Sequence, residues 1–356
     1  MMKGLKKWRL FSLLTVMTVF LSACGEEYIS TLRPSGQVGK EQLNILYLSI
    51  AIMALVVIVV STIYLVAFFK FRRSKVGEDH MPKQVEGSHT LEVIWTVIPI
   101  ILLLVLAVPT LHYTYKFSNV AAMDEVDESG NNTALTVNVT AKLYWWEFEY
   151  PNQGIITAQE LVVPTDEKVY FNLIASDVKH SFWIPAIGGK MDTNVDGINK
   201  FYLQFDRESA GLNDGEGVFY GKCAELCGPS HALMDFKVKA LEPEAFNAWV
   251  TAMQATEGAT ADKESSDLGE ATFANSCLGC HAVSGVAGNG LGPNLTTFGD
   301  RNRVAGFLEH TVENTTEWII DPEPYKPGNT MTGKYNVTRE EAQAIADYLM
   351  TLSVEK

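Results

Sequence analysis

Four side chains that can bind a metal ion lie in one short segment. They follow the pattern Cys223-x3-Cys227-x3-His231-x2-Met234. Thiolate, imidazole and thioether ligands together favour copper, whereas zinc sites rarely use methionine. A mononuclear blue-copper site needs one cysteine and two histidines, but two cysteines let each sulfur bridge a pair of metal ions. The segment has one histidine, so we expect a second at His180, the other histidine of the same predicted β domain.

A second reactive motif reads Cys277-Leu-Gly-Cys280-His281. This spacing is typical of covalent haem c attachment, in which two thiols add to the porphyrin vinyl groups and the adjacent histidine binds iron. A chance match or half of a zinc site is the alternative. Met331 lies downstream and is the predicted sixth iron ligand, with His310 as a competitor. Methionine ligation would raise the reduction potential of the haem.

The one remaining cysteine, Cys24, follows a basic N-terminal segment and a stretch of apolar residues. Basic residues, a short apolar stretch and small residues before a cysteine are typical of a signal peptide. The sequence Leu-Ser-Ala-Cys looks like a bacterial lipoprotein signal, so we predict a signal peptide over 1–23, lipidation of Cys24 and an external segment over 24–42. An ordinary signal or membrane helix with an incidental cysteine is the alternative. These assignments leave no cysteine for a disulfide.

Two further segments are long and apolar enough to cross a membrane. Residues 43–69 and 93–115 contain no Asp, Glu, Lys or Arg, and each is long enough for a hydrocarbon core of about 30 Å at about 1.5 Å per helical residue. The loop between them, 70–92, begins with a cluster of lysines and arginines, which marks the cytoplasmic side. The N-terminal segment and everything after residue 116 are therefore predicted to lie outside.

The net charge of the chain limits the classes of partner that it is expected to bind. The 356 residues carry a formal net charge of −14, and much of the acidity lies in the predicted outer part. Such a surface attracts a basic protein partner, because the summed field steers opposite charge. A simply solvated face is the alternative. Nothing in the sequence indicates nucleic acid.

The predicted outer part divides into two domains. Residues 120–133 are polar and acidic and are typical of a linker, whereas residues 134–254 contain short stretches of period-two alternation separated by turn signals, which indicates an all-β sandwich or barrel. Residues 255–266 are small and polar, with too little apolar surface to order themselves. Residues 267–356 have a helical pattern, and Thr338 to Glu341 form a predicted capping box before the last helix.

Residues 28 to about 254 resemble subunit II of haem–copper cytochrome c oxidases. That resemblance implies two transmembrane helices followed by a cupredoxin-like Greek-key barrel that holds the binuclear CuA centre. It also implies that the Glu225 side chain reaches a magnesium ion at the interface with subunit I. The implied copper ligands are His180, Cys223, the backbone carbonyl of Glu225, Cys227, His231 and Met234.

Two more segments take part in the resemblance. The run from His89 is similar to the start of the second helix in that family, where Glu92 matches the carboxylate at the entrance of a proton path, although an acidic residue in a first helical turn is also ordinary capping. The aromatic run holding Tyr144, Trp145 and Trp146 resembles the patch through which electrons reach CuA. The tryptophan through which electrons enter in that family aligns with Tyr144 of this chain. Packing in the protein core is the alternative role for these aromatic rings, above all for Trp146.

A subunit II fused to a class I, all-α cytochrome c domain resembles the arrangement of caa-type oxidases. The expected protein is a multidomain subunit of the bacterial cell membrane, with its copper and haem domains on the outer face. It would take electrons from quinol–cytochrome c reductase or a cytochrome c and pass them through haem c and CuA to subunit I, where O2 is reduced with proton translocation. The alternatives are the CuA subunit of a nitric oxide reductase and a copper-delivery lipoprotein.

Overall fold

The structure is a computed structural model that describes residues 12, 15–16, 25–77, 80–128, 130, 132–286 and 291–355. These described residues form two compact units, one within 41–119 and one within 25–40 together with 120–355. Cys24 and nearly all of the predicted signal peptide lie outside the described residues, so their assignment stays a prediction.

The smaller unit contains two long apolar helices and a short basic helix between them. Helix α2 spans Gln37–Lys70, the short helix α3 spans Arg73–Val76, and α4 spans His89–Phe117. The mean hydropathy of the apolar window is 2.8 in α2 and 2.7 in the helical stretch that begins at His89, and both are long enough to cross a membrane. Ser88 caps α4 by accepting a hydrogen bond from the Leu91 amide at 3.5 Å.

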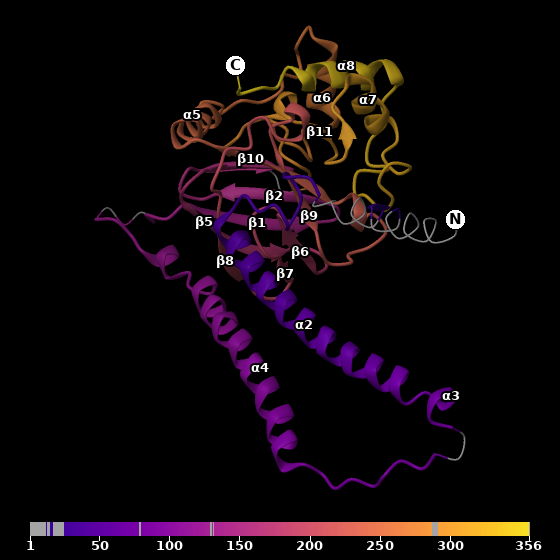
Figure 1. The fold of residues 1–356 in the computed structure, drawn as a ribbon. Coiled ribbons are helices and arrows are strands. Elements are labelled where there is room, and N and C mark those ends of the chain that lie inside the picture. Colours follow the sequence, from indigo (N-terminus) through magenta and orange to yellow (C-terminus); the bar gives the residue numbers. More distant parts are fainter. Residues whose placement is uncertain are drawn as a thin grey trace. The chain divides into compact units, whose positions relative to one another are not determined.

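The β domain of the larger unit has two five-stranded sheets (Figure 1). Their orders are β3-β2-β1-β5-β8 and β4-β10-β9-β6-β7. Strand pairs β1–β5 and β4–β10 are parallel and the other pairs are antiparallel, as in a Greek-key sandwich rather than a meander. The bounds are β1 Thr136–Lys142, β2 Trp145–Tyr150, β3 Ile155–Ala158, β4 Glu160–Pro164, β5 Lys168–Ala175, β6 His180–Trp183, β7 Met191–Thr193, β8 Asn199–Gln204, β9 Phe219–Cys223 and β10 Asp235–Leu241.

Aromatic side chains fill the space between these sheets. Alternation along β2 turns Trp146 and Phe148 inward, where both are fully buried. The Trp146 ring lies 5.6 Å from Phe182 and 5.3 Å from Phe236, and the last two rings stack at 4.8 Å between centroids. Trp146 is therefore a core residue of the sandwich, in agreement with its packing interpretation.

Short helices follow the sandwich. Three 3-10 turns, η1 Ala121–Asp124, η2 Asn213–Gly215 and η3 His231–Leu233, lie in its connections, and α5, Pro243–Gln254, closes the β domain. Beyond it, α6 Leu268–Ser276 and α7 Val312–Ile320 pack against α8 Arg339–Met350 (Figure 1). The turn η4 Phe298–Asp300 and the two-residue strands β11 Arg303–Val304 and β12 Leu308–Glu309 lie between α6 and α7.

The capping box predicted at the start of the last helix is confirmed. The Thr338 side chain accepts from the Glu341 amide, and the Glu341 carboxylate accepts from the Thr338 amide, so both members of the capping box are present. The inward face of α8 is buried in one core with α6 and α7. Ala261, which lies in the predicted linker over 255–266, packs into that same core.

Candidate metal and haem sites

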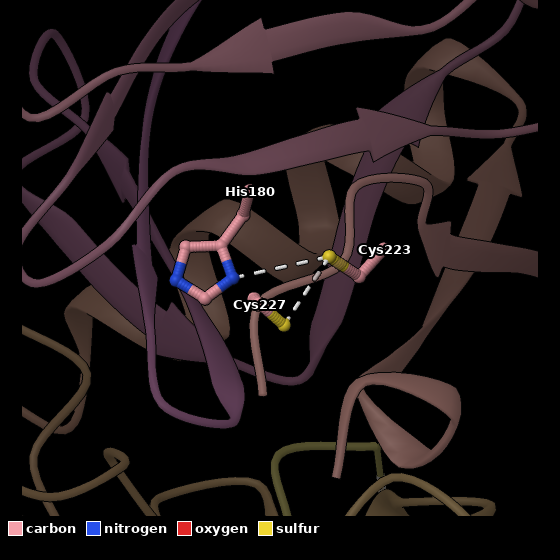
Figure 2. Close-up of side chains that lie close together, drawn as sticks. All are labelled: His180, Cys223 and Cys227. Carbon is pink, nitrogen blue, oxygen red and sulfur yellow. Dashed lines mark hydrogen bonds between the residues drawn. The ribbon is translucent and has the colours of Figure 1, made fainter. Parts of the chain in front are cut away.

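Three neighbouring strands of one sheet bring the sulfur and imidazole groups together. Strand β6 begins at His180, and β9 pairs with it and ends at Cys223. The loop from residue 224 to 234 then carries Cys227 and His231 back to the start of β10, which pairs with the other side of β9. Figure 2 shows His180, Cys223 and Cys227 pointing toward one another. His180, the second histidine that the sequence predicts for the cluster, lies beside both cysteines. Its role as a metal ligand stays a prediction.

The donor atoms are arranged in two matched halves. The two sulfurs lie 3.9 Å apart, with His180 Nδ1 at 3.8 Å from Cys223 Sγ and His231 Nδ1 at 3.7 Å from Cys227 Sγ. A weaker donor accompanies each half: the Glu225 carbonyl oxygen at 3.3 Å from Cys223 Sγ, and Met234 Sδ at 3.9 Å from Cys227 Sγ. The number and softness of these donors fit two copper ions that share both sulfurs.

Burial and hydrogen bonding prepare this cluster for a cation. The hydrogen bond with Cys227 lowers the pKa of Cys223 to about 3 and, in turn, raises the pKa of Cys227. Burial lowers the pKa of His180, but its hydrogen bonds to Cys223 and Asp177 outweigh burial and raise it overall. Thiolates bind metals only after losing their protons, so a metal ion would displace the proton that the sulfurs share.

A carboxylate behind the cluster orients His180. Asp177 Oδ1 lies 2.8 Å from His180 Nε2, and the Asp177 carboxylate also accepts from the Val178 amide at 2.6 Å and the Leu143 amide at 2.7 Å. With Nε2 held in this way, Nδ1 faces the sulfurs. Sequence reasoning missed Asp177, although a carboxylate three residues before a proposed ligand was the available signal.

The haem motif lines one mostly apolar cavity. Cys277, Cys280 and His281 line it, and so does Met331 from a later loop of the same domain. His281 Nδ1 lies 2.8 Å from the Pro293 carbonyl oxygen, which leaves Nε2 as the donor for iron, and burial lowers the pKa of His281, which favours the neutral imidazole that binds metals. These residues fit a haem with histidine and methionine ligands.

His310, the alternative to Met331 as iron ligand, lies away from the haem cavity. Its ring packs 5.2 Å from the Phe298 ring, and it is absent from the described residues that line the cavity. Met331 faces the cavity from a loop in which Asn329 Oδ1 accepts the Met331 amide at 2.9 Å. Of these two residues, Met331 is therefore the one placed to bind the iron of a haem in this cavity.

Two of the three expected electron-input aromatics also face the haem cavity. Tyr144 and Trp145 line it together with Leu143, although all three belong to the β domain. The Tyr144 hydroxyl is close to two glycine backbones. A Cβ at Gly228, in the copper loop, would overlap this hydroxyl, and a Cβ at Gly328, near Met331, would lie 3.5 Å from it. Tyr144 therefore contacts the loops of both sites.

The remaining predicted site residues are placed more simply. Glu92 lies in the first turn of α4, where its amide donates to the Ser88 carbonyl at 3.0 Å. The Glu225 side chain is partly exposed beside the copper cluster, while its carbonyl belongs to the cluster. Trp146 packs in the core, 6.2 Å from the His180 ring.

Comparisons with known proteins agree with this architecture. Three family models match: the transmembrane domain of cytochrome c oxidase subunit II over residues 35–113, its periplasmic domain over 154–241, and cytochrome c over 266–353. These domains imply copper and haem c.

Whole-length relatives carry all three regions. Cytochrome c oxidase subunit 2 of Bacillus sp. strain PS3 is 55% identical over 100% of both chains, and that of Bacillus subtilis strain 168 is 49% identical over 98% of this chain and 99% of the relative. A solved structure, the periplasmic domain of oxidase subunit II from Bradyrhizobium japonicum, is 30% identical over 33% of this chain and 91% of its own, with a TM-score of 0.29. The chain therefore belongs to the cytochrome c oxidase subunit 2 family, in the caa3-type form that carries a fused cytochrome c domain.

Proposed function

We propose that this chain is the electron-input subunit of a respiratory haem–copper oxidase. When bound, haem c and a binuclear copper centre would supply one-electron transfer, in that order, toward subunit I, where O2 is reduced. The observation that carries the proposal is the pair of thiols 3.9 Å apart, each with its own imidazole. A single-metal site would have no use for two such matched halves.

The residues of the copper cluster would act by holding a fixed geometry. Cys223, Cys227, His180 and His231 would hold the copper ions, and Met234 and the Glu225 carbonyl would complete the set of donors. His180 and Cys223 lie at the ends of paired strands, and both are buried together with Met234, so the positions of these donors change little when charge changes. A rigid, dry site favours rapid electron transfer because little surrounding structure has to rearrange.

The residues around the haem cavity would set its potential. Cys277 and Cys280 would hold the porphyrin covalently, and His281 and Met331 would bind the iron. Methionine ligation and an apolar wall both raise the reduction potential, as a haem that accepts electrons from a reductase or a soluble cytochrome c requires. Tyr144 and Trp145, which line the cavity, would carry electrons from this haem into the copper domain.

The membrane unit would join the chain to its partners. Helices α2 and α4 would pack against subunit I, with the basic loop after α2 in the cytoplasm. Glu92 would receive protons at the entrance of a path into subunit I, and the Glu225 side chain would reach a magnesium ion at the same interface. Lipidation at Cys24 would add a second anchor at the outer surface.

Metal and haem analysis of the full chain, expressed without subunit I, tests the proposal. Two copper atoms and one covalent haem per chain are expected, with one unpaired electron shared over both copper nuclei in the spin-resonance spectrum. Cys227→Ser should destroy that shared signal and leave the haem unchanged. Zinc or a single copper atom in the wild-type chain would contradict the proposal, as would consumption of nitric oxide in place of O2 by the assembled complex.

A further inference from the structure

The β domain and the cytochrome c domain meet through a charged interface that neither cofactor requires. Asn302, beside β11, donates its amide to Glu160 of β4 at 2.8 Å and its side-chain nitrogen to the Glu216 carbonyl at 2.9 Å. Arg303 pairs with the Glu216 carboxylate and donates to the Tyr220 hydroxyl at 3.2 Å. Each of these bonds joins one domain to the other.

Two lysines of β10 extend the same interface. Lys239 Nζ donates to the Asp300 carbonyl at 3.0 Å and pairs with Glu355 at 2.8 Å. Lys237, whose exposed fraction is 2%, donates to the Gly306 carbonyl at 3.1 Å. Burial lowers the pKa of Lys237 to about 8, which reflects how thoroughly the cytochrome c domain covers this side of β10.

Further contacts lie outside this ionic patch. The Ile156 amide of β3 donates to the Gly285 carbonyl at 2.7 Å, and Ser230 of the copper loop donates to the Pro327 carbonyl at 2.7 Å. Three separate points of attachment define the position and the orientation of one rigid body on another. The third point lies between the copper loop and the loop that carries Met331.

We propose that Glu216 and Lys239, with their partners Arg303 and Glu355, form an ion-pair latch that holds the cytochrome c domain in one docked position on the copper domain. The latch rests on the proposed function for its purpose, which is to keep the two cofactors at a fixed separation. Its four members are positioning residues, because none of them faces the haem cavity or the copper cluster. Polar interfaces are typical of contacts between domains of one chain.

Hydrogen exchange measured by mass spectrometry on the full chain tests the latch without reference to electron transfer. The variants are Glu216→Arg, Arg303→Glu and the double exchange of both residues. Each single variant places like charges together, so we expect faster exchange in the peptides that carry Ile156 and Asn302, whose amides bond across the interface. The double variant should restore slow exchange, because it reverses the pair without removing it.

The rate of copper reduction after photoreduction of the haem gives a second readout. It should fall by roughly tenfold or more in each single variant, as expected when one partner of an interface charge pair is lost, and should recover in the double variant. Glu317→Arg is the matched control, because Glu317 pairs with Arg339 inside the cytochrome c domain at 2.6 Å. It should leave both readouts unchanged.

Two results would overturn the latch. One is fast exchange of both peptides in the wild-type chain, and the other is slow exchange in both single variants. If the proposed function is wrong, the result is different. A chain without paired copper would still show slow amide hydrogen exchange at Ile156 and Asn302.

Discussion

The carboxylate behind His180 should control copper affinity. Asp177 accepts hydrogen bonds from His180 Nε2 and from the Leu143 and Val178 amides. Asp177→Asn keeps one acceptor oxygen and replaces the other with a donor, so at least one of these three groups loses its partner. A hydrogen bond to a charged group contributes about 1.5–3 kcal/mol. If the loss falls on His180, copper affinity should drop roughly 10- to 100-fold, the range found for such supporting residues.

Chelator titration of the full chain measures this loss, with the haem absorbance as an internal reference for protein amount. Glu149→Gln is the matched control, because the exposed Glu149 carboxylate bonds to Asn138 on the outer face of β1 and β2. It should retain copper like the wild type. If Asp177→Asn also holds copper as tightly as the wild type while His180→Ala loses it, the orienting role of Asp177 is wrong.

Three more changes have definite expected outcomes. Tyr150→Phe should lower the free energy of unfolding by about 2–4 kcal/mol in denaturant titrations, because the buried Tyr150 hydroxyl satisfies both the amide and the carbonyl of Val162. Burial lowers the pKa of Lys326 to about 7 from 10.5, so the unfolded chain binds more protons between those pH values. Stability should therefore rise with pH across that window, by up to about 1.4 kcal/mol per pH unit, and this contribution should level off below pH 7, where both states hold the proton; thermal unfolding of Lys326→Met should show a flatter rise. Met331→Leu should abolish the absorbance of methionine-ligated haem and lower its potential in a redox titration, whereas His310→Leu should leave both unchanged; the reverse pattern would make His310 the ligand.

The copper cluster could be predicted from sequence because its ligands are close in the chain. Cys223, Cys227, His231 and Met234 lie in one short segment, so their spacing indicates the chemistry without knowledge of the fold. His180 needed one further step, the expectation of a shared β domain. Asp177 gave no comparable signal, since a carboxylate near a strand end is usually solvated, and only the backbone path shows which nitrogen of His180 it contacts.

The docked interface was beyond sequence analysis for a physical reason. Strand β10 reads Asp-Phe-Lys-Val-Lys-Ala-Leu, and such alternation ordinarily predicts one apolar face and one solvated face. The polar face is instead covered by the cytochrome c domain, which buries Lys237 and most of Lys239. A pattern of residues reports which side of a strand is polar, and it cannot report whether water or another domain lies against that side.

Tyr144 shows why the two sites have to be understood together. Its hydroxyl lies against Gly228 of the copper loop and Gly328 of the loop that carries Met331, and both glycines have positive φ angles, 138° and 77°. Any side chain at either glycine would be strained, and one at Gly228 would also displace the tyrosine. A larger indole at position 144 would meet the same two backbones. The same close packing places the Tyr144 ring between the copper loop and the loop that carries Met331.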